Sequence, residues 1–341
     1  MIKATLNQAP SAGPAAPARL MPALWRYGGI AAVAAIACVL PFAIGGYRLS
    51  QFSQVLIYAI AMLGLNILTG FNGQISLGHG AFYAIGAYTT AILLDKTGMP
   101  YWATVPIAGA ICLGAGFLFG LPALRLEGPY LALATFALAV AIPQLLKFKG
   151  LDPWTGGVQG VQLDSPVAPF GLPLNSDRWT YYFCLLWTVA LVLVARNLLR
   201  GRTGRAMIAI RDQPLAAAAM GIDTARYKSM TFGVSAMYTG IAGALGALLS
   251  AYVSPDSFPA LLSIKLLVGS VVGGIVSIAG IFIGALFIEF TPNVAEQVSK
   301  AAPDAIFGLF LIALMYFVPR GASGVLDFIG VQLRRGPAAK R

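Results

Sequence analysis

A short helix with clear boundaries is the most distinctive functional pattern in the sequence. It lies inside a basic loop, residues 196–228, which carries seven cations and two acids between two long apolar stretches. Asp212 is placed to cap the first turn, Pro214 is tolerated at the first helical position, and Gly221 can adopt the left-handed conformation that ends a helix. The small side chains of Ala216–Ala219 would let another protein approach closely. The pattern favours a docking helix, and an amphipathic helix resting on lipid headgroups is the alternative.

A second polar pattern, rich in glycine, precedes the third apolar stretch of the chain. Gln74, Ser76 and His79 offer hydrogen-bond donors and acceptors, while Gly73 and Gly78 would let helices approach closely. These residues are candidates to line or gate a pathway for a small solute, and a turn with structural glycines is the alternative. We interpret the single histidine as a structural hydrogen-bonding group rather than a proton carrier.

The chemistry that enzymes need is missing from the sequence. There is no nucleophile–base pair, paired-carboxylate site, zinc motif or Gly-x-x-x-x-Gly-Lys-Ser/Thr phosphate loop, so we predict no catalytic residue, no metal site and no cofactor bound by this chain. Glu289 and Lys265 fall near the ends of predicted membrane spans, where a charged group can reach the interface. Ion-coupled carriers normally keep ionisable groups at mid-membrane. Their scarcity indicates that any transport is energised by another subunit.

The composition identifies the elements that must position these groups. Of 341 residues, 58% are hydrophobic and only 10% are charged, whereas a soluble domain is about one quarter charged. Apolar stretches long enough to cross a bilayer recur along the chain, and their lack of alternation predicts helices rather than a barrel. The net charge of +11 does not indicate nucleic-acid binding, because the cations lie in the loops between spans. We interpret the three cysteines as small buried hydrophobic residues.

About ten transmembrane helices are predicted, within a permease domain of residues 27–320. Residues 1–26 read as a disordered cytoplasmic tail and residues 321–341 as a basic cytoplasmic tail. A long loop, residues 150–178, separates two of the spans. The predicted spans are residues 28–44, 52–68, 81–94, 102–121, 129–146, 179–195, 229–251, 264–276, 278–290 and 305–318.

The distribution of charge predicts the orientation of these spans. With the N-terminus in the cytoplasm, the inner segments hold sixteen cations and four acids, and the outer segments hold seven cations and eight acids. The positive-inside rule therefore places both termini in the cytoplasm. It also places residues 196–228 in the cytoplasm and residues 150–178 outside.

The number of spans allows two halves of five helices, which would have inverted topologies. A glycine-rich junction in the second half, with Gly273, Gly274 and Ser277, corresponds in this interpretation to the one that contains Gly73 and Gln74. Paired glycine-interrupted segments in the two halves of a transporter indicate its pathway. Close helix packing is the simpler reason for glycine in membrane helices.

Four motifs together resemble the permease subunits of branched-chain amino acid ABC importers, and the LivM-type subunit more than its LivH-type partner. The resemblance extends from about residue 49 to residue 326. The motifs are GQISLGHGAFYAIGAYTTAIL (73–93), LPALRLEGPYLALATFA (121–137), GRAMIAIRDQPLAAAAMGI (204–222) and YFVPRGASGVL (316–326).

The resemblance implies a fold of ten helices in an inverted repeat and a multi-pass protein of the bacterial cytoplasmic (inner) membrane. It implies a LivH-type second permease subunit, two cytoplasmic ATPases that bind ATP and Mg, an external substrate-binding protein and surrounding membrane lipid. Solute would move inward by alternating access. Family substrates such as urea, short amides or aromatic acids are alternatives, as is an ion-coupled secondary carrier. By the resemblance, the segment that docks on an ATPase comprises Ala216, Ala217, Met220, Gly221 and Ile222.

Overall fold

The computed structural model describes residues 35–126, 128–169, 175–298, 308–313 and 316 of the chain. It divides into two units, residues 1–45 and 46–341. In the first unit, residues 35–43 are helical. The predicted tails and the beginning of the first span lie outside the described residues, as does half of the tenth span, of which residues 308–313 and 316 are helical.

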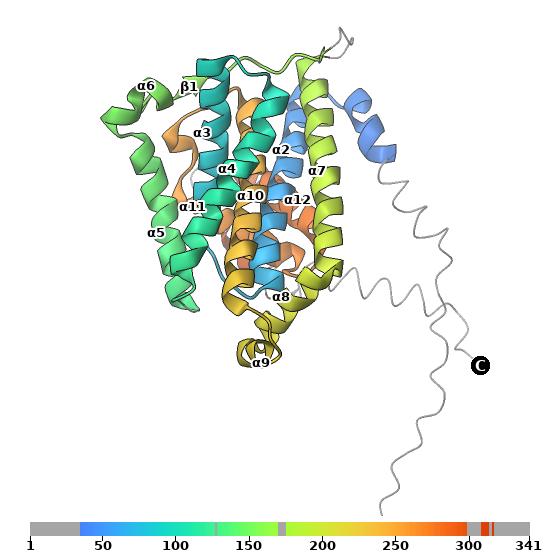
Figure 1. The fold of residues 1–341 in the computed structure, drawn as a ribbon. Coiled ribbons are helices and arrows are strands. Elements are labelled where there is room, and N and C mark those ends of the chain that lie inside the picture. The colour runs from blue at the N-terminus through green and yellow to red at the C-terminus, as the bar shows by residue number, and fades with distance from the viewer. Residues whose placement is uncertain (1–34, 127, 170–174, 299–307, 314–315, 317–341) are drawn as a thin grey trace, which may run out of the picture. The chain divides into compact units, whose positions relative to one another are not determined.

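The second unit is a bundle of long helices, as the sequence predicts, with one short two-stranded ribbon (Figure 1). Seven helical segments of the described residues are long and apolar enough to cross a membrane. The helices of the bundle are α2 (Gly46–Leu65), α3 (His79–Thr97), α4 (Tyr101–Ala123), α5 (Pro129–Leu146), α7 (Ser176–Arg200), α10 (Thr224–Ser250), α11 (Ala260–Gly273) and α12 (Ile278–Val298).

The helix α3 is the one long bundle helix outside that set of seven. Its sequence, HGAFYAIGAYTTAILLDKT, mixes glycine, threonine and charged residues with apolar ones. It is nevertheless packed inside the bundle, where Phe82, Ala84 and Ala87 are buried. The predicted third span is therefore a helix that meets other protein rather than lipid over most of its surface.

The central element of the bundle is α10, which packs against α4, α3 and α2 (Figure 1). Its 27 residues extend about 40 Å at the usual helical rise. Small residues let its neighbours approach closely. A Cβ at Gly240 would lie 2.5 Å from the Cβ of Cys112 on α4, and one at Gly86 on α3 would lie 2.6 Å from the Cα of Gly240.

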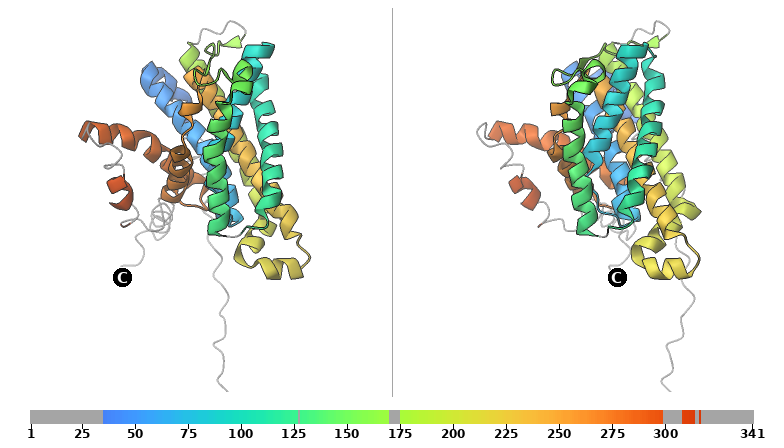
Figure 2. Two further views of the ribbon diagram at one scale, coloured as in Figure 1. Left: turned by 90° about the vertical axis from the view of Figure 1, so that its left-hand side faces the viewer. Right: turned by 60° about the vertical axis from the view of Figure 1, so that its left-hand side comes forward.

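The two ends of the bundle differ in structure. At one end, α8 (Arg202–Asp212) and α9 (Pro214–Ala219) link α7 to α10 and extend beyond the bundle in every view (Figures 1 and 2); we call this the coupling-loop end. At the other end, strands β1 (Val161–Gln162) and β2 (Tyr252–Val253) pair antiparallel, with Val161 opposite Val253. The helix α6 (Asp152–Thr155) and two 3-10 turns, Lys149–Leu151 and Pro255–Ser257, lie at this ribbon end.

Two charged residues lie deeper in their helices than the sequence predicts. Glu289 is the twelfth of the 21 residues of α12, and Lys265 is the sixth of the 14 residues of α11; both are half-buried. The prediction that they lie near span ends was wrong, because α11 starts earlier and α12 continues further than the apolar stretches. The later part of α12 projects sideways from the bundle (Figure 2).

The cysteines also differ from expectation at one position. Cys112 and Cys184 are buried in the bundle, as predicted, whereas Cys38 is exposed within its own unit. Apolar stretches of sequence predict membrane insertion, but they do not distinguish a side chain that faces lipid from one that faces protein.

Candidate functional site

The predicted docking helix is present as α9, with boundaries close to those expected. Pro214 occupies its first position, and Gly221 has a φ of +84°, so the predicted left-handed end is confirmed. The capping role predicted for Asp212 was wrong. Gln213 stands at the N-cap position without a side-chain cap, while Asp212 ends α8 and pairs with Arg211, the Nε···Oδ1 distance being 2.9 Å.

The exposed surface of α9 is narrower than the alanine run suggests. Leu215 and Met220 are 86% and 84% exposed, and Ala216 is also exposed. Ala217, by contrast, is only 4% exposed, because it faces the rest of the chain. Its carbonyl accepts a hydrogen bond from the backbone N–H of Ile222 at 3.1 Å. Ala217 therefore packs α9 against the rest of the chain, and a partner would contact Leu215, Met220 and the exposed alanines.

The segment between α2 and α3 enters the bundle as irregular chain. The helix α2 continues into a π-helical turn, Asn66–Phe71, and α3 begins only at His79. Within this segment, the side chain of Gln74 is buried and donates from Nε2 to the carbonyl of Lys228 on α10 at 3.3 Å. The carbonyl of Gln74 accepts from the Thr69 hydroxyl at 3.0 Å. These bonds fix the segment to the π-helical turn that continues α2 and to the start of α10.

A buried hydrogen-bond network continues from Ser76 into the core. The Oγ of Ser76 lies 3.2 Å from Nδ1 of His79, and Nε2 of His79 lies 2.7 Å from Oγ of Ser235 on α10. Ser235 donates its hydroxyl hydrogen to the carbonyl of Gly64 on α2 at 2.6 Å. Because a hydroxyl has one hydrogen, Ser235 must accept from Nε2, and Ser76 must donate to Nδ1. Both ring nitrogens of a neutral His79 are thereby satisfied, which suits a structural role.

Two further hydroxyls hold the start of α3. The backbone N–H of Leu77 donates to Thr135 Oγ1 on α5 at 2.9 Å, and that of Gly80 donates to Ser263 Oγ on α11 at 2.8 Å. Close packing accompanies these bonds, since a Cβ at Gly78 would lie 2.8 Å from the Thr135 carbonyl oxygen. The 72–78 segment is thus tied to α5, to α10 and to the π-helical turn after α2, while the start of α3 is tied to α11.

Thr135 provides a test of this arrangement. Thr135→Val keeps the shape of the side chain but leaves the N–H of Leu77 without its acceptor, which is expected to cost about 1–3 kcal/mol of stability. Thr90→Val is the matched control, because Thr90 is equally buried and its hydroxyl has no hydrogen-bond partner among the described residues. The thermal unfolding midpoint in detergent should fall for the first variant and stay near wild type for the second. Equal midpoints would contradict the role assigned to Thr135.

The two glycine-rich junctions lie against each other. A Cβ added at Gly70 would collide with the carbonyl oxygen of Ile275, which is part of the α11–α12 junction. Six helices (α3, α4, α5, α7, α10 and α11) separate the two junctions along the chain, so both lie at the same end of the bundle. Counterparts in an inverted repeat would lie at opposite ends. The predicted correspondence was therefore wrong, and the junctions are neighbours instead.

The residues of the second junction form a tight turn. Gly274 has a φ of +104°, which favours glycine, and the Oγ of Ser277 accepts from the N–H of Gly280 at 3.1 Å. Gly273 packs directly on Gly280, so that a Cβ at Gly273 would meet its carbonyl. This turn gives the Ile275 carbonyl its position beside Gly70.

A small pocket of about 180 Å³ joins the docking loop to the 72–78 segment. Both predicted sets of residues contribute to its wall, Pro214 from the docking helix and Gly73 and Gln74 from the pathway candidates. Sequence reasoning assigned no site role to the three other polar residues that line it. These are Asn72, Arg211 and Lys228.

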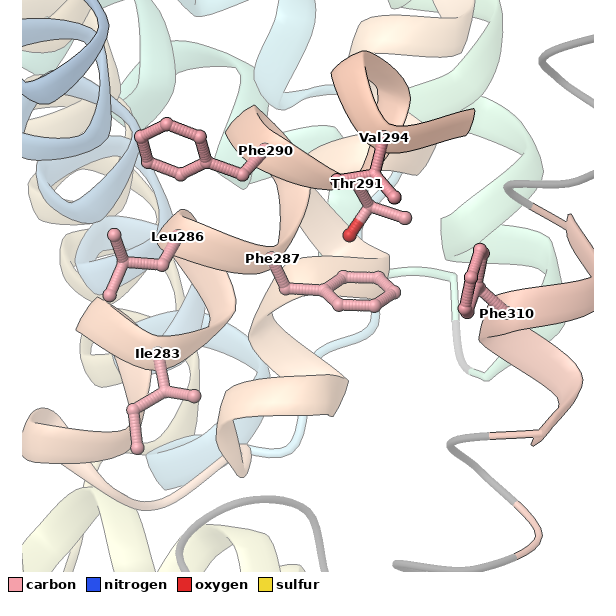
Figure 3. A pocket seen from close by; sticks show the side chains of 7 residues that line it. All are labelled: Ile283, Leu286, Phe287, Phe290, Thr291, Val294 and Phe310. Atoms are coloured by element: carbon pink, nitrogen blue, oxygen red, sulfur yellow. The ribbon is translucent and has the colours of Figure 1, made fainter. Parts of the chain in front are cut away.

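A larger pocket of about 430 Å³ lies elsewhere, between α12 and residue 310 (Figure 3). Its wall is apolar except for the hydroxyl of Thr291, as the side chains of Phe287, Phe290 and Phe310 illustrate. It contains none of the predicted site residues. With no charged group among the described residues of its wall, this part of the pocket is poorly suited to recognising a zwitterion.

Sequence reasoning missed the hydroxyls of Ser235 and Ser263 and the ion pair of Arg211 with Asp212. Ser235 belongs to a run of small residues on α10 that reads equally well as helix packing. Ser263 lies immediately before the apolar stretch predicted as the eighth span. Nothing local in the sequence indicates that residues more than 150 positions apart, such as His79 and Ser235, are in contact.

The helical bundle, its apolar spans and the exposed loop helix define a multi-pass membrane protein. The chain belongs to the family described as the permease component of branched-chain amino acid transport systems, whose model matches residues 47–319. This confirms the resemblance inferred from the motifs.

Individual relatives agree with this assignment. The chain is 32% identical to the high-affinity branched-chain amino acid transport system permease protein LivM of Salmonella typhimurium, over 85% of this chain and 73% of the relative. It is 32% identical to LivM of Escherichia coli K12, over 86% and 73% of the two chains. It is 26% identical to LivH of Salmonella typhimurium, over 78% and 91%. No solved structure matches the chain.

Proposed function

We propose that this chain is a permease subunit of an ATP-driven importer for branched-chain or related amino acids in the bacterial inner membrane. Its partners would be a LivH-type permease subunit, two cytoplasmic ATPases that bind ATP and Mg, and an external substrate-binding protein. The full domain would have ten helices in two inverted halves with cytoplasmic termini. The observation that carries the proposal is the exposed helix α9, whose loop is connected to the buried polar network.

The two ends of the bundle support the proposed orientation. At the coupling-loop end, the described chain from residue 200 to residue 228 carries six cations and two acids. The ribbon end is balanced instead, and its ion pairs include Lys147 with Asp256 at 2.6 Å and Lys96 with Asp95 at 2.7 Å. The positive-inside rule assigns the coupling-loop end to the cytoplasm. There α9 would meet the ATPases, and residues 150–178 would face the binding protein.

The proposed mechanism is alternating access driven from α9. ATP binding would draw the two ATPases together and displace α9, and the bundle would respond at the 72–78 segment. This segment is held by separate hydrogen bonds to the π-helical turn after α2, to α5 and to α10, so a displacement of the segment would act on several helices at once. The residues Gly73, Gln74, Ser76, Gly78 and His79 would then act as a gate.

Ion-coupled transport is a second candidate, favoured by one observation. Glu289 lies in the middle of α12, within the candidate span Ile278–Glu296, where ionisable groups are rare and commonly functional. This weakens the argument that the spans lack ionisable groups. The proposal of an ATP-driven importer therefore rests on the family and on α9 rather than on an absence of charge.

Reconstituted vesicles distinguish the two candidates. The complete complex is reconstituted into vesicles. The binding protein and labelled leucine are added on the side of the membrane that the binding protein contacts, and ATP and Mg are supplied on the side that carries the ATPases. We expect uptake that requires ATP and persists when ion gradients are collapsed. Glu289→Gln should leave this uptake intact. Uptake that follows a gradient without ATP and fails in Glu289→Gln would instead establish the carrier. Competition by urea, a short amide or phenylalanine would define the substrate class.

A further inference from the structure

Arg211 connects the docking loop to the irregular segment of the bundle. It lies one residue before the end of α8, and its Nη1 donates to the carbonyl of Gly70 at 2.9 Å. Its Nε donates to the carboxylate of Asp212, also at 2.9 Å. The stem of the side chain lies along the backbone of Gly73, where an added Cβ would be 2.8 Å from the Cγ of Arg211. One side chain thus contacts both ends of the Gly70–Gly73 turn.

The acceptor of this bond is at the last turn of a helix. Gly70 is the fifth residue of the π-helical turn Asn66–Phe71, where carbonyl groups lose their helical partners. A guanidinium at this point satisfies such a carbonyl and interacts favourably with the negative end of the helix. Gly70 is also the residue against which the Ile275 carbonyl packs. Arg211 therefore binds the place where the α2–α3 and α11–α12 junctions meet.

The connection to α9 is short and direct. Only Asp212 and Gln213 lie between Arg211 and the first residue of α9. The carbonyl of Gln213 accepts from the N–H of Ala217 in α9 at 3.0 Å, and its N–H donates to the carbonyl of Ala209 in α8 at 3.0 Å. Gln213 is therefore hydrogen-bonded to both helices. A displacement of α9 must move Arg211 or break its bond to Gly70.

The connection also continues inward from Gly70. The N–H of Gln74 donates to the carbonyl of Leu68 at 3.2 Å, two residues before Gly70. From Ser76 the network passes through His79 to Ser235, which lies about 10 Å along α10 from Lys228 at the usual helical rise. The chain from Gly70 to Ser76 and these hydrogen bonds therefore connect Gly70 to buried groups well inside the bundle.

We propose that Arg211 is the positioning residue that transmits the movement of α9 to the 66–78 segment through its hydrogen bond to Gly70. This proposal rests on the proposed function, because it assumes that α9 is moved by an ATPase. In this proposal, Arg211 determines how efficiently ATP hydrolysis produces uptake. Arg211 is not needed for binding the ATPase or for folding. Energetic couplings between sites are typically worth 5- to 150-fold.

The experiment measures ATP hydrolysis and leucine uptake in the same vesicles that contain the complete complex. In Arg211→Met, the complex should assemble and hydrolyse ATP, while the number of leucine molecules taken up per ATP falls about tenfold or more. Arg205→Met is the matched control, since Arg205 is an exposed residue of the same helix and should keep the wild-type ratio. Asp212→Asn should also keep most of the ratio, because the bond to Gly70 remains. Arg211→Lys retains the charge and should recover part of the loss.

Three outcomes would overturn the proposal. The first is a wild-type ratio in Arg211→Met. The second is a failure of Arg211→Met and Arg211→Lys to assemble with the ATPases, which would make Arg211 a docking or folding residue. The third is an equal fall in the ratio for Arg205→Met. Failure of the proposed function is separate from all three, because it would appear as a wild-type complex without ATP-dependent uptake.

Discussion

Aspartate at Leu215 or Met220 is expected to abolish ATP-driven uptake while the chain still folds and inserts. Both side chains are more than four-fifths exposed on or beside α9, so they contribute little to the packing of this chain. In a protein–protein contact, a carboxylate at an apolar anchor would be desolvated without a partner. Loss of an interface hot spot typically costs about 2–4 kcal/mol, which corresponds to roughly 30- to 1000-fold in affinity.

Co-purification of the ATPases with the tagged permease measures this effect directly, and uptake in vesicles measures its consequence. For co-purification, Val158→Asp is the matched control, because Val158 is also apolar and exposed but lies near the ribbon end, away from α9. Wild-type uptake in both Leu215→Asp and Met220→Asp would contradict docking through α9. Ala217 is a poor choice for this test, since a charged group there would disturb the buried face that seats the helix.

Leucine at Gly86 is expected to prevent the bundle from packing. A Cβ at this position of α3 would fall on the backbone of Gly240 in α10, 2.6 Å from its Cα. Backbone atoms of a buried helix cannot move aside as the end of a flexible side chain can. Overpacking of a core commonly costs about 1–3 kcal/mol, and here the entire side chain must be accommodated where even a methyl group has no room.

Thermal unfolding and the fraction of monodisperse protein in detergent provide the measurement. Gly114→Leu is the control, because a Cβ at Gly114 in α4 meets nothing within 4 Å. We expect the Gly86 variant to be recovered poorly or to unfold at a clearly lower temperature, and the Gly114 variant to resemble wild type. Similar behaviour of the two variants would show that the α3–α10 contact is not closely packed.

The sequence predicted the helices better than their ends. Apolar stretches determine where a chain can cross lipid, and most of the predicted spans correspond to helices of the bundle. The ends depend on contacts that the sequence does not display. Lys265 and Glu289 lie away from the helix ends because α11 begins at Ala260, before the predicted stretch 264–276, and α12 continues to Val298, beyond the predicted stretch 278–290.

In the docking helix too, features set by local sequence were predicted correctly, and features set by tertiary contacts were not. The constraints on Pro214 and Gly221 are local, since they concern the backbone angles and missing donors of one helix, and both were predicted correctly. The roles of Asp212 and Ala217 depend on tertiary neighbours. Asp212 belongs to the end of α8 and pairs with Arg211 instead of capping α9, and Ala217 faces the chain rather than the solvent.

The polar segment between α2 and α3 was recognised from composition, but its partners were not. Residue type identified Gln74, Ser76 and His79 as groups that need hydrogen bonds. The partners come from α10, at Lys228 and Ser235, and only the fold reveals them. The relation between the two glycine-rich junctions was also a matter of topology, because the number of intervening helices decides whether they share an end.

The central position of α10 restricts how this subunit can meet a second permease. Its flanks are occupied by α2, α3 and α4 of the same chain, and α2 is covered almost as completely. Apolar side chains such as Leu118, Leu133 and Leu186 instead point outward from α4, α5 and α7. The proposed contact with a second permease subunit would therefore run along these outer helix faces. Because α10 is enclosed by helices of its own chain, its amides should exchange hydrogen most slowly among the described helices.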